Sequence, residues 1–567
     1  MSIIVFDLEA NGLNELVLDR KGNPSTEADK IHVLITKDIK TGIVSEFVGD
    51  DISIGYDLLK NADAIVGHNI ILYDLRILER LLGVCTTKAI DTLIVSRMMY
   101  PDKGNHPLKG NSLKLWGEHL GITKSEYTLG WEDVNDEMIA YCKQDVEVSE
   151  AIYKAQIPFM KQYPKSVKLE HLVTEIIAGQ IDNGFTFDLD QALDLEKDLM
   201  IEKACIEDEM RTIFPDIMHI RYSEKTGKRL KDKIEVFNPG SRKQIGERLV
   251  NKYKWKPPLT DKGNYHIDSD VLSSLDFPEA KKLCTYFDTT KLMSQVSDWV
   301  IRASSSRDGK IHGSINPQGT VTGRMTASQP NLQQVSGDPR ARALFKPRDG
   351  WVQVGIDASG LEARLLASRM AKFDGGAYAE EILSGDIHTK NQEVAGLETR
   401  DQTKTFFYGF IYGAGNKKIG EIIGKGAGAG AALKKKFLSG LPALNKVIKR
   451  AKLSAKKYKT VTLLDGRDVP VRSEHRALNT LIQGDGAIVM KLAQVIFHNS
   501  IVNGGYSDRC KFLATVHDEW QMECCPSIAD MIGSMGVGAI VEAGKKLGCR
   551  MPMDGEYRIG KNWSECH

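Results

Sequence analysis

The nine cysteines of this 567-residue chain form no C-x-x-C pair. Without that spacing a structural zinc site is not expected, and scattered thiols are typical of the reducing cytoplasm. No apolar run approaches the ~20 residues of a membrane span, and acids interrupt the opening MSIIVF too soon for a signal peptide. Internal repeats are not apparent. The sequence therefore predicts a cytoplasmic protein without a membrane anchor.

The chain also lacks an excess of one charge, because 76 Lys and Arg face 75 Asp and Glu, for a formal net charge of +1. This balance alone argues neither for nor against a nucleic-acid partner, so the distribution of charge matters more. Residues 434–459 contain many lysines and no acid, and a short basic stretch lies at 223–233. Each stretch is either a surface that contacts a nucleic-acid backbone or a solvated face, and both interpretations stay open.

Residues 399–413, TRDQTKTFFYGFIYG, carry the most informative pattern. Arg400, Lys404, Tyr408 and Tyr412 recur every fourth residue, which on a helix places them in one slowly drifting stripe. A guanidinium and an ammonium one turn apart suit a polyphosphate, and a ring one turn further on suits a base and sugar. An amphipathic helix with a solvated basic edge is the alternative for this segment considered alone.

Two other segments supply candidate acids. In WVQVGIDASGLEARLLA, residues 351–356 predict a buried strand that ends at Asp357. In FLATVHDEW, an apolar run leads to His517, Asp518 and Glu519, which predicts a hairpin tip that carries acids. An Asp at a strand end is usually a cap or turn residue, so each segment alone is a weak signal. Together they supply the two carboxylates that two-metal phosphoryl transfer requires.

The stripe R-x3-K-x3-Y-G, with these acid segments on either side of it, resembles the finger helix and palm motifs of family A (Pol I-like) DNA polymerases. The resemblance implies that Asp357 and Asp518 ligate the two metals. It places Ala358 in the same metal site and makes Glu519 a neighbour of that site.

The same resemblance assigns a nucleotide site. It implies that Glu362 lies under the sugar beside Tyr408 and helps to exclude a 2′-hydroxyl. A tyrosine at position 408 implies tolerance of dideoxynucleotides, and Lys404 is implied to supply a proton to pyrophosphate. The implied nucleotide-binding residues are Arg400, Lys404, Tyr408, Tyr412, Glu362 and, in the segment GDIHTKNQ, His388.

Further segments agree with a DNA-binding polymerase. GTVTGRMTASQPNLQQ resembles the T-x-G-R segment of the family, which implies that Arg324 lies in the minor groove near the primer terminus. In EHRALNTLIQGDGA the four-residue spacing puts His475, Asn479 and Gln483 on one helical face. Amide side chains in the minor groove meet acceptors common to every correct base pair, so they test pair shape rather than sequence. His517 completes the implied DNA-binding set.

The N-terminus predicts a second, separate chemistry. In SIIVFDLEANGL, Asp7 and Glu9 point to one face of an apolar strand, where two carboxylates repel unless a cation lies between them. VGHNIILYDLRIL adds Asp74, which is otherwise a helix-start acid, and AYCKQDVEV adds Tyr141 and Asp145 one helical turn apart. In this order the set resembles 3′–5′ proofreading exonucleases with a DEDDy active site. The resemblance implies that the four acids hold two metals and that the tyrosine orients the attacking water.

The predicted fold class is α/β multidomain, with an RNase H-like 3′–5′ exonuclease domain followed by a right-hand polymerase of palm, fingers and thumb. The predicted domains are 1–155 for the exonuclease, 156–309 for the polymerase base and thumb, 310–385 and 460–567 for the palm, and 386–459 for the fingers. Within the fingers, GKGAGAGAA at 424–432 predicts a loop or soft turn.

The resemblance covers almost the whole chain and is nearest to the replicative polymerases of the small T-odd phages. It implies extension of primer–template DNA with deoxynucleoside triphosphates in the host cytoplasm. Two Mg²⁺ per active site are implied, with Mn²⁺ as a substitute. Phage helicase–primase and single-stranded DNA-binding protein are the implied partners. Those polymerases carry a long thumb insertion that clasps thioredoxin, whereas this chain has only the short basic loop at 223–233, so no such clamp is expected.

Two alternative functions are compatible with parts of this pattern. One is a 3′–5′ exonuclease whose polymerase half is catalytically silent, and the other is a non-catalytic DNA-binding scaffold. The intact set of Asp357, Asp518, Arg400, Lys404 and Tyr408 argues against the first. Two complete sets of metal-binding acids are hard to explain in a scaffold.

Overall fold

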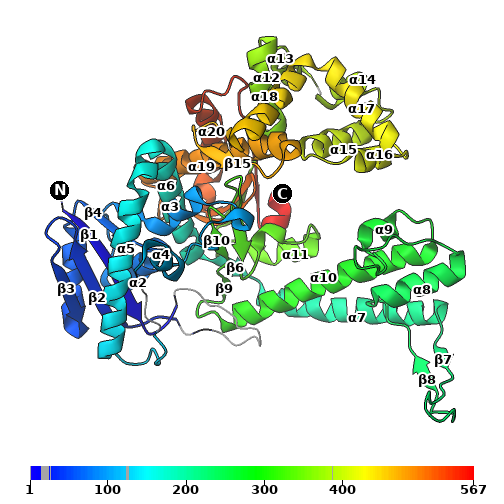
Figure 1. Ribbon diagram of the computed structural model, residues 1–567, viewed down its shortest axis with the longest axis horizontal. Helices are drawn as coiled ribbons and strands as arrows, with labels where there is room; N and C mark the ends of the chain where they lie inside the picture. The colour runs from blue at the N-terminus through cyan, green and yellow to red at the C-terminus, as the bar shows by residue number, and fades with distance from the viewer. Residues whose placement is uncertain (1, 14–24, 26, 123–126, 386) are drawn as a thin grey trace. The chain divides into compact units, whose positions relative to one another are not determined.

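The structure is a computed structural model that describes residues 2–13, 25, 27–122, 127–385 and 387–567, with the side chains of Lys103, Ile387 and His388 outside the described part. The chain divides into two compact units (Figure 1). The first contains the N-terminal residues up to Thr186, His312–Gln334 and Lys346–His567, and the second contains Phe187–Ile311 and Val335–Phe345. None of the nine cysteines is in a disulfide.

A five-stranded sheet with strand order β3-β2-β1-β4-β5 forms the N-terminal part of the first unit. Its strands are β1 (Ile3–Ala10), β2 (Ile31–Asp38), β3 (Val44–Val48), β4 (Ala64–Gly67) and β5 (Ala89–Asp91). β1 runs antiparallel to β2 and parallel to β4. Successive residues of β1 are buried in different apolar clusters, Val5 in one and Phe6 in another, so the sheet is covered on both faces.

Helices supply that cover, and Figure 1 shows the longest of them, α5, running along the sheet. They are α1 (Ile52–Lys60), α2 (Asp74–Leu82), α3 (Thr92–Met99) and α5 (Asp136–Gln162), and α4 (Leu113–Leu120) packs on α5. Met138 and Val146 of α5 are fully buried against Val5 of β1. The Asn135 side chain accepts a hydrogen bond from the Met138 backbone N–H at 2.9 Å and so fixes the start of α5.

The C-terminal part of the first unit is centred on a four-stranded antiparallel sheet of order β16-β17-β13-β18. Its strands are β13 (Val352–Ala358), β16 (Cys510–Val516), β17 (Glu519–Cys524) and β18 (Gly555–Gly560). The predicted buried strand is confirmed as β13, and the predicted hairpin tip is the turn between β16 and β17. The helices α6 (Pro164–Asn183) and α20 (Ala529–Lys546) pack on the sheet, and α19 (Ala477–Asn503) packs on both helices.

One helical stretch in the described part of the chain, Glu474–Asn503, is long and apolar enough to cross a membrane. Of its most apolar window, 83% is buried inside the protein, and the core helix of a globular fold passes the same test. The sequence shows no unbroken apolar run here because buried polar residues such as Asp485 and Lys491 interrupt it. Their burial means that most of the helix surface is covered by protein, although Val502 near its end is 48% exposed.

Seven α-helices of the described chain lie between β13 and β14 (Thr460–Thr462): α12 (Leu361–Asp374), α13 (Ala377–Ser384), α14 (Ile387–Ala395), α15 (Arg400–Ile411), α16 (Asn416–Ile422), α17 (Ala427–Gly440) and α18 (Pro442–Tyr458). α16 and α17 approach each other closely, since a Cβ on Gly430 would stand 2.0 Å from the Asn416 carbonyl oxygen. The predicted loop at 424–432 is wrong for residues 427–432, which begin α17. Glycine is needed there for close helix packing rather than for a turn.

The second unit is mostly helical. It contains α7 (Leu189–Ile213), β7 (Ile217–His219), β8 (Lys233–Glu235), α8 (Arg242–Tyr253), α9 (Ser269–Ser273), α10 (Pro278–Ser305), β9 (Lys310–Ile311) and α11 (Pro339–Ala343). α7 and α10 pack along each other. The Ser241 side chain accepts from the Gln244 backbone N–H at 3.4 Å, which caps the start of α8.

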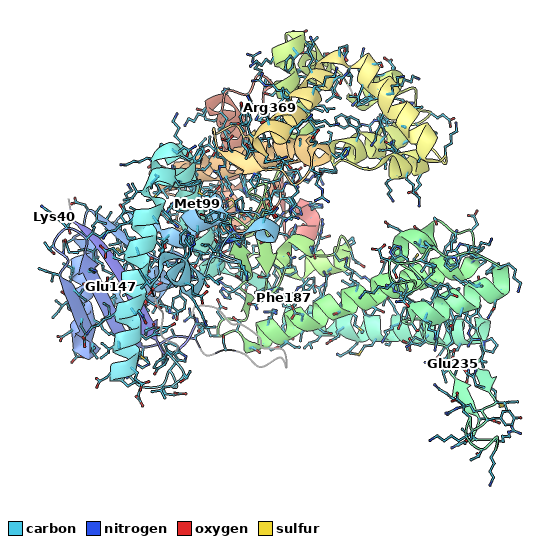
Figure 2. The ribbon with its side chains drawn as sticks, viewed as in Figure 1. Lys40, Met99, Glu147, Phe187, Glu235 and Arg369 are labelled. Atoms are coloured by element: carbon cyan, nitrogen blue, oxygen red, sulfur yellow. The ribbon has the colours of Figure 1, made fainter. Side chains whose placement is uncertain are left out.

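The β7–β8 hairpin carries the basic stretch 223–233 between its two strands. Met218 and Ile234 lie opposite each other in the ladder and are 63% and 60% exposed. The side chains around Glu235 and along the hairpin project into solvent (Figure 2).

The remaining short strands of the described chain are β6 (Phe185–Phe187), β10 (Ser314–Asn316), β11 (Thr326–Ser328), β12 (Phe345–Lys346), β14 (Thr460–Thr462) and β15 (Asp468–Pro470). Against these elements, the predicted boundary at 155 falls inside α5, and the predicted boundary at 309 falls just before β9. The boundary at 385 falls between α13 and α14, and that at 459 falls between α18 and β14.

Candidate active sites

The palm acids meet because β13 and β17 are neighbouring antiparallel strands. Asp357 near the end of β13 lies opposite Glu519 at the start of β17. Asp518 lies in the turn just before β17, and its carbonyl oxygen accepts a hydrogen bond from the Ala358 backbone N–H at 3.1 Å. His517 makes the turn possible by adopting a left-handed conformation with φ 57°. Strand register thus brings acids from two distant segments to one edge of the sheet.

The two aspartates are costly to ionise where they lie. Burial, together with the Asp518 and Glu519 carboxylates, raises the pKa of Asp357 to about 7. Burial, together with the Glu362 carboxylate, raises the pKa of Asp518 to about 6. Clustered, partly buried carboxylates of this kind are stabilised by a hard divalent cation, which prefers oxygen ligands. The donor set therefore fits magnesium.

The carboxylate of Glu519 is already engaged in protein contacts. It accepts hydrogen bonds from Trp563 Nε1 at 3.1 Å and from the Gln521 side chain, and it lies 2.9 Å from His567 Nδ1. These contacts give Glu519 a part in holding the C-terminal residues in place. Its predicted part in catalysis stays a prediction.

Glu362, at the start of α12, links three of the predicted site residues. Its Oε1 accepts hydrogen bonds from Arg324 Nη2 at 2.9 Å and from the Tyr412 hydroxyl at 3.0 Å. The rings of Tyr408 and Tyr412 stack with centroids 6.3 Å apart. Burial and the Glu362 carboxylate raise the pKa of Tyr412, so its hydroxyl remains a donor. The predicted neighbours Glu362 and Tyr408 are therefore connected through Tyr412.

The predicted stripe lies on α15, with Tyr412 one residue beyond its end. The Thr399 side chain caps the helix by accepting from the Gln402 backbone N–H at 3.2 Å. Arg400 and Lys404 are exposed, whereas the opposite face of the helix is buried. The helix dipole places partial positive charge at the start of α15, so this end of the helix attracts an anion in addition to the two cationic side chains. His388 lies in α14, and its side chain is outside the described part of the chain.

Four of the five predicted DNA-binding residues line two cavities, and His475 lines neither of them. Arg324, Asn479 and Gln483 line one of about 490 Å³, together with Arg472 and Arg476. His517, Arg324 and Asp518 line another of about 30 Å³. His475 lies in the short 3₁₀ helix Glu474–Arg476, one turn before α19.

Sequence reasoning missed the two arginines of the larger cavity. Arg472 and Arg476 are four residues apart and lie next to the predicted polar face that begins at His475. The same four-residue spacing, started one position later along the chain, joins Arg472 to Arg476 and could have found them.

All five residues predicted at the N-terminus line one cavity of about 700 Å³. Asp7 and Glu9 come from β1, Asp74 begins α2, and Tyr141 and Asp145 come from α5. The helix-start interpretation of Asp74 is also correct, since it is the first residue of α2. Burial, together with the Asp91 and Asp145 carboxylates, raises the pKa of Asp74 to about 7. This cluster therefore also fits a divalent cation.

Cys142 was not predicted at this site. Its Sγ lies 3.5 Å from Asp7 Oδ2, and the possible ligand atoms of Cys142, Asp7 and Glu9 lie within 4.8 Å of one another. Burial and the Asp7 carboxylate raise the pKa of the thiol well above its usual value. The protonated thiol is thus a hydrogen-bond donor to Asp7 rather than a thiolate ligand.

The walls of this cavity also carry cations that sequence reasoning missed. Arg97 of α3, Lys109 in the segment before α4, and Lys114 of α4 all border it. They are scattered in the sequence without a periodic pattern, so only the folded chain brings them together. Cations around an acidic centre suit a ligand that is itself polyanionic.

The fold matches that of a known polymerase structure. The "POL domain of Pol1 from M. smegmatis complex with DNA primer-template and dNTP" superposes with a TM-score of 0.81 at 18% sequence identity. The match covers 99% of this chain and 96% of that one. The chain therefore has a mixed α/β fold similar to that of this polymerase structure.

Sequence comparison identifies the family. The model for DNA polymerase family A matches residues 218–565. The DNA-directed DNA polymerases of Enterobacteria phage T3 and Escherichia phage T7 are each 31% identical to this chain, over 100% of both sequences. The chain belongs to DNA polymerase family A.

Proposed function

We propose that this protein is a template-directed DNA polymerase with a 3′–5′ proofreading exonuclease that replicates phage DNA in the host cytoplasm. Family membership supports the polymerase activity. The observation that carries the full proposal is the presence of two separate carboxylate clusters in one chain, each with an aspartate whose pKa is raised to about 7. Neither a silent polymerase half nor a DNA-binding scaffold has a use for both clusters.

In the polymerase site, Asp357, Asp518 and the Ala358 backbone would hold two Mg²⁺. When bound, the ions lower the pKa of the primer 3′-hydroxyl and neutralise the charge of the leaving pyrophosphate. Arg400 and Lys404 bind the triphosphate from the exposed face of α15, and Lys404 gives a proton to pyrophosphate.

The residues around the aspartates hold the nucleotide and the primer terminus. Glu362 lies under the sugar and excludes a 2′-hydroxyl, and its bonds to Arg324 and Tyr412 fix its carboxylate in one position. The Tyr408 ring stacks on the base. Asn479 and Gln483 meet the minor groove in a cavity that also contains two arginines for the backbone.

In the exonuclease site, Asp7, Glu9, Asp74 and Asp145 would hold two Mg²⁺, which when bound supply an ionised water. Tyr141 orients that water toward the terminal phosphodiester. The cavity of about 700 Å³ has room for a frayed nucleotide, and the cations on its walls contact the phosphates. The strand order of the sheet, with three antiparallel strands followed by two parallel ones, supports an RNase H-like fold.

No thioredoxin clamp is part of this proposal. The alignments with the T3 and T7 polymerases span 722 positions against the 567 residues of this chain, so the relatives have residues at many positions where this chain has none. The hairpin between β7 and β8 is short. Added thioredoxin is expected to leave the number of nucleotides incorporated per binding event unchanged. Helicase–primase and single-stranded DNA-binding protein remain the proposed partners.

One gel tests both activities. An end-labelled primer annealed to a longer template is incubated with magnesium, with and without the four deoxynucleoside triphosphates. Extension with nucleotides and shortening without them are expected, and EDTA should stop both. Shortening in both lanes would instead indicate a nuclease with a silent polymerase half.

A further inference from the structure

The segment Gln318–Arg324 borders three cavities of the first unit, and we call it the shared wall. Gln318 and Gly319 line the cavity of the N-terminal acids, and Gly319 and Arg324 line the cavity of about 490 Å³. Arg324 also lines the small cavity beside Asp518. One short stretch of chain therefore runs from the proposed exonuclease site to the proposed polymerase site.

The shared wall is a tight turn that holds its own shape. The Gly323 backbone N–H donates to the Thr320 carbonyl at 3.0 Å, and the Thr320 N–H donates to the Arg324 carbonyl at 3.2 Å. Gly323 has φ 80°, a conformation that side chains rarely adopt. Because the turn is internally rigid, the contacts of its two end residues, Gln318 and Arg324, set the position of the whole segment.

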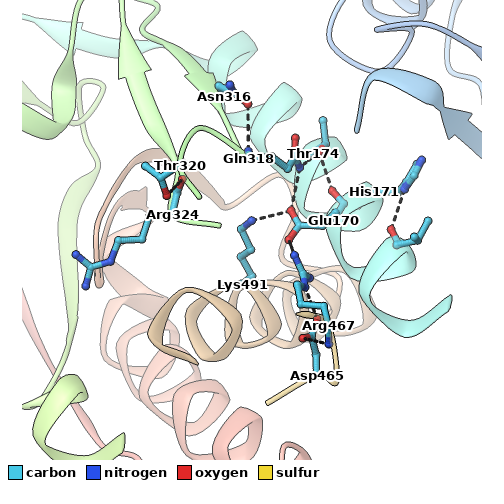
Figure 3. Close-up of polar contacts among 11 residues, drawn as sticks. Glu170, His171, Thr174, Asn316, Gln318, Thr320, Arg324, Asp465, Arg467 and Lys491 are labelled. Carbon is cyan, nitrogen blue, oxygen red and sulfur yellow. Dashed lines mark hydrogen bonds and ion pairs between the residues drawn. The ribbon is translucent and has the colours of Figure 1, made fainter. Parts of the chain in front are cut away.

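One end is anchored by a buried carboxylate, that of Glu170 in α6 (Figure 3). Its Oε2 accepts hydrogen bonds from Gln318 Nε2 at 2.9 Å and from Lys491 Nζ at 2.6 Å. Its Oε1 accepts from Arg467 Nη1 at 2.6 Å. Figure 3 shows these side chains converging on Glu170 from separate segments of the chain.

The charges in the cluster around Glu170 cancel, but removing these charged groups from water has an unfavourable free energy. Glu170 is 0% exposed and Lys491 only 2% exposed, and Arg467 also pairs with Asp465 at 2.7 Å. Although burial alone would raise it, Lys491 and Arg467 lower the pKa of Glu170 to about 2. Buried ion pairs are often no more stabilising than well-packed apolar residues, so stability alone gives little reason for this arrangement.

Its geometry suggests a different role, because a single oxygen of Glu170 binds one residue from each site. Gln318 lines the N-terminal cavity, whereas Lys491 of α19 lines the cavity beside Asp518. We propose that Glu170 is a positioning residue that holds the shared wall in register with α19, so that a primer 3′ end passes along the wall from one site to the other. This inference rests on the proposed function, since it requires both activities.

The expected consequence is specific to strand transfer. A wall that is no longer tied to Glu170 shifts relative to α19, while the acids of each site keep their own supports in β1, β13 and the β16–β17 turn. Small displacements of groups that position a substrate have large effects on rate. Transfer is therefore impaired more than the reaction at either site.

The test uses the full chain bound to a primer–template with a mismatched, end-labelled 3′ terminus. The reaction is started with magnesium, the four deoxynucleoside triphosphates and excess unlabelled DNA as a trap. The fraction of primers excised and then extended without dissociation is divided by the rates on single-stranded DNA and on matched primer. Gln318→Leu removes the bond to Glu170 and leaves the ion pairs intact, and it should lower this normalised fraction about fivefold, the equivalent of one hydrogen bond.

Glu523→Gln is the matched control. Glu523 is an equally buried carboxylate that pairs with Arg348 Nε at 2.7 Å, and among the described residues it lines none of the three cavities. It should reduce stability without changing the normalised fraction. The double variant Glu170→Gln/Lys491→Met keeps the cluster neutral, because Arg467 retains Asp465, and it should behave like Gln318→Leu.

An unchanged normalised fraction in Gln318→Leu and in the double variant would overturn the proposal. The proposal would also be overturned if the fraction before normalisation fell in Gln318→Leu only in proportion to slower degradation of single-stranded DNA. Gln318 would then act only within the exonuclease site. If the unaltered protein does not shorten single-stranded DNA, the proposed function itself fails before any variant is compared.

Discussion

The two acid clusters differ in how much of each site the protein completes by itself. The N-terminal acids line a cavity of about 700 Å³ with cations on its walls. Of the predicted palm acids, Asp518 borders a cavity of only about 30 Å³, and Arg400 and Lys404 lie exposed on α15. Under the proposed function, the first pocket receives a strand end without further rearrangement. The second site is then completed by duplex and nucleotide, as expected where closure of the fingers selects the correct pair.

The clusters also differ in how they are held together. The palm acids depend on the register of one β-hairpin against β13. The N-terminal acids come from a strand and two helices, and Asp74 Oδ1 accepts a hydrogen bond from the Leu8 backbone N–H at 3.3 Å. A site assembled from three elements can lose one acid without moving the others, and this difference can be tested.

The largest effect is expected from Asp74→Asn. Loss of a metal-binding acid should lower degradation of single-stranded DNA roughly a hundredfold or more and leave primer extension intact. Because burial raises the pKa of Asp74 to about 7, the neutral amide should also raise the free energy of unfolding in EDTA at pH 8 by about 1–3 kcal/mol. Gel assays and urea denaturation measure the two quantities.

Asp91→Asn is the control for that variant. Asp91 is also buried near Asp74, but its carboxylate accepts hydrogen bonds from the backbone N–H groups of Asn69 at 2.9 Å and Ile71 at 3.1 Å. It should lose roughly 1–3 kcal/mol of stability. If Asp74→Asn degrades single-stranded DNA as fast as the unaltered protein, Asp74 is not a residue of the exonuclease site.

Stability should depend on pH and magnesium through the same carboxyls. The pKa values of Asp357 and Asp74 are raised from 3.8 to about 7, so the folded protein binds more protons than the unfolded chain between these values. The free energy of unfolding in EDTA should therefore fall as pH rises from 4 to 8, by about 1–3 kcal/mol. Magnesium should stabilise the protein more at pH 8 than at pH 5, and equal stabilisation at both would contradict the account. Thermal melts at fixed ionic strength measure this.

Gly430→Ala tests the predicted fingers, residues 386–459, which under the proposed function serve only the polymerase site. The added Cβ would meet the Asn416 carbonyl oxygen at 2.0 Å and force α16 and α17 apart, which should cost about 1–3 kcal/mol. Primer extension should slow while degradation of single-stranded DNA does not. Gly428→Ala is the matched control, because its Cβ has nothing within 4 Å, and it should be neutral or slightly stabilising. Equal slowing of both activities by Gly430→Ala would mean that the fingers are not specific to synthesis.

The smallest effect is expected from Tyr412→Phe. This substitution removes the hydroxyl that donates to Glu362 at 3.0 Å. Because Tyr412 is 42% exposed, the loss of nucleotide-binding free energy should be only about 1 kcal/mol. The KM for nucleotides should rise about fivefold, with less change in kcat. Tyr458→Phe, at an exposed position in α18, should change neither constant. Steady-state kinetics on a matched primer would show whether the two variants differ.

Sequence reasoning reached the acids because strand endings and a hairpin tip are local patterns. It placed Asp357 and Asp518 on the correct elements, and the structure brings the five predicted N-terminal residues to one cavity. The four-residue spacing likewise predicted the helix that carries Arg400 and Lys404.

What the sequence could not give depends on contacts between distant segments. Cys142 meets Asp7, and Glu170 meets Gln318, only after the chain has folded. The glycine-rich composition at 424–432 predicts a loop, whereas residues 427–432 are helical, because composition does not distinguish a flexible segment from a closely packed helix. Such features are set by tertiary structure rather than by local propensity.

The separation of the two sites is the central claim, and one experiment with two variants tests it most directly. Asp357→Asn and Asp7→Asn are compared on the same end-labelled primer–template, with magnesium, with and without nucleotides. Asp357→Asn should shorten the primer and never extend it, and Asp7→Asn should extend the primer and never shorten it. Loss of both activities in either variant, with the fold intact by circular dichroism, would contradict the account.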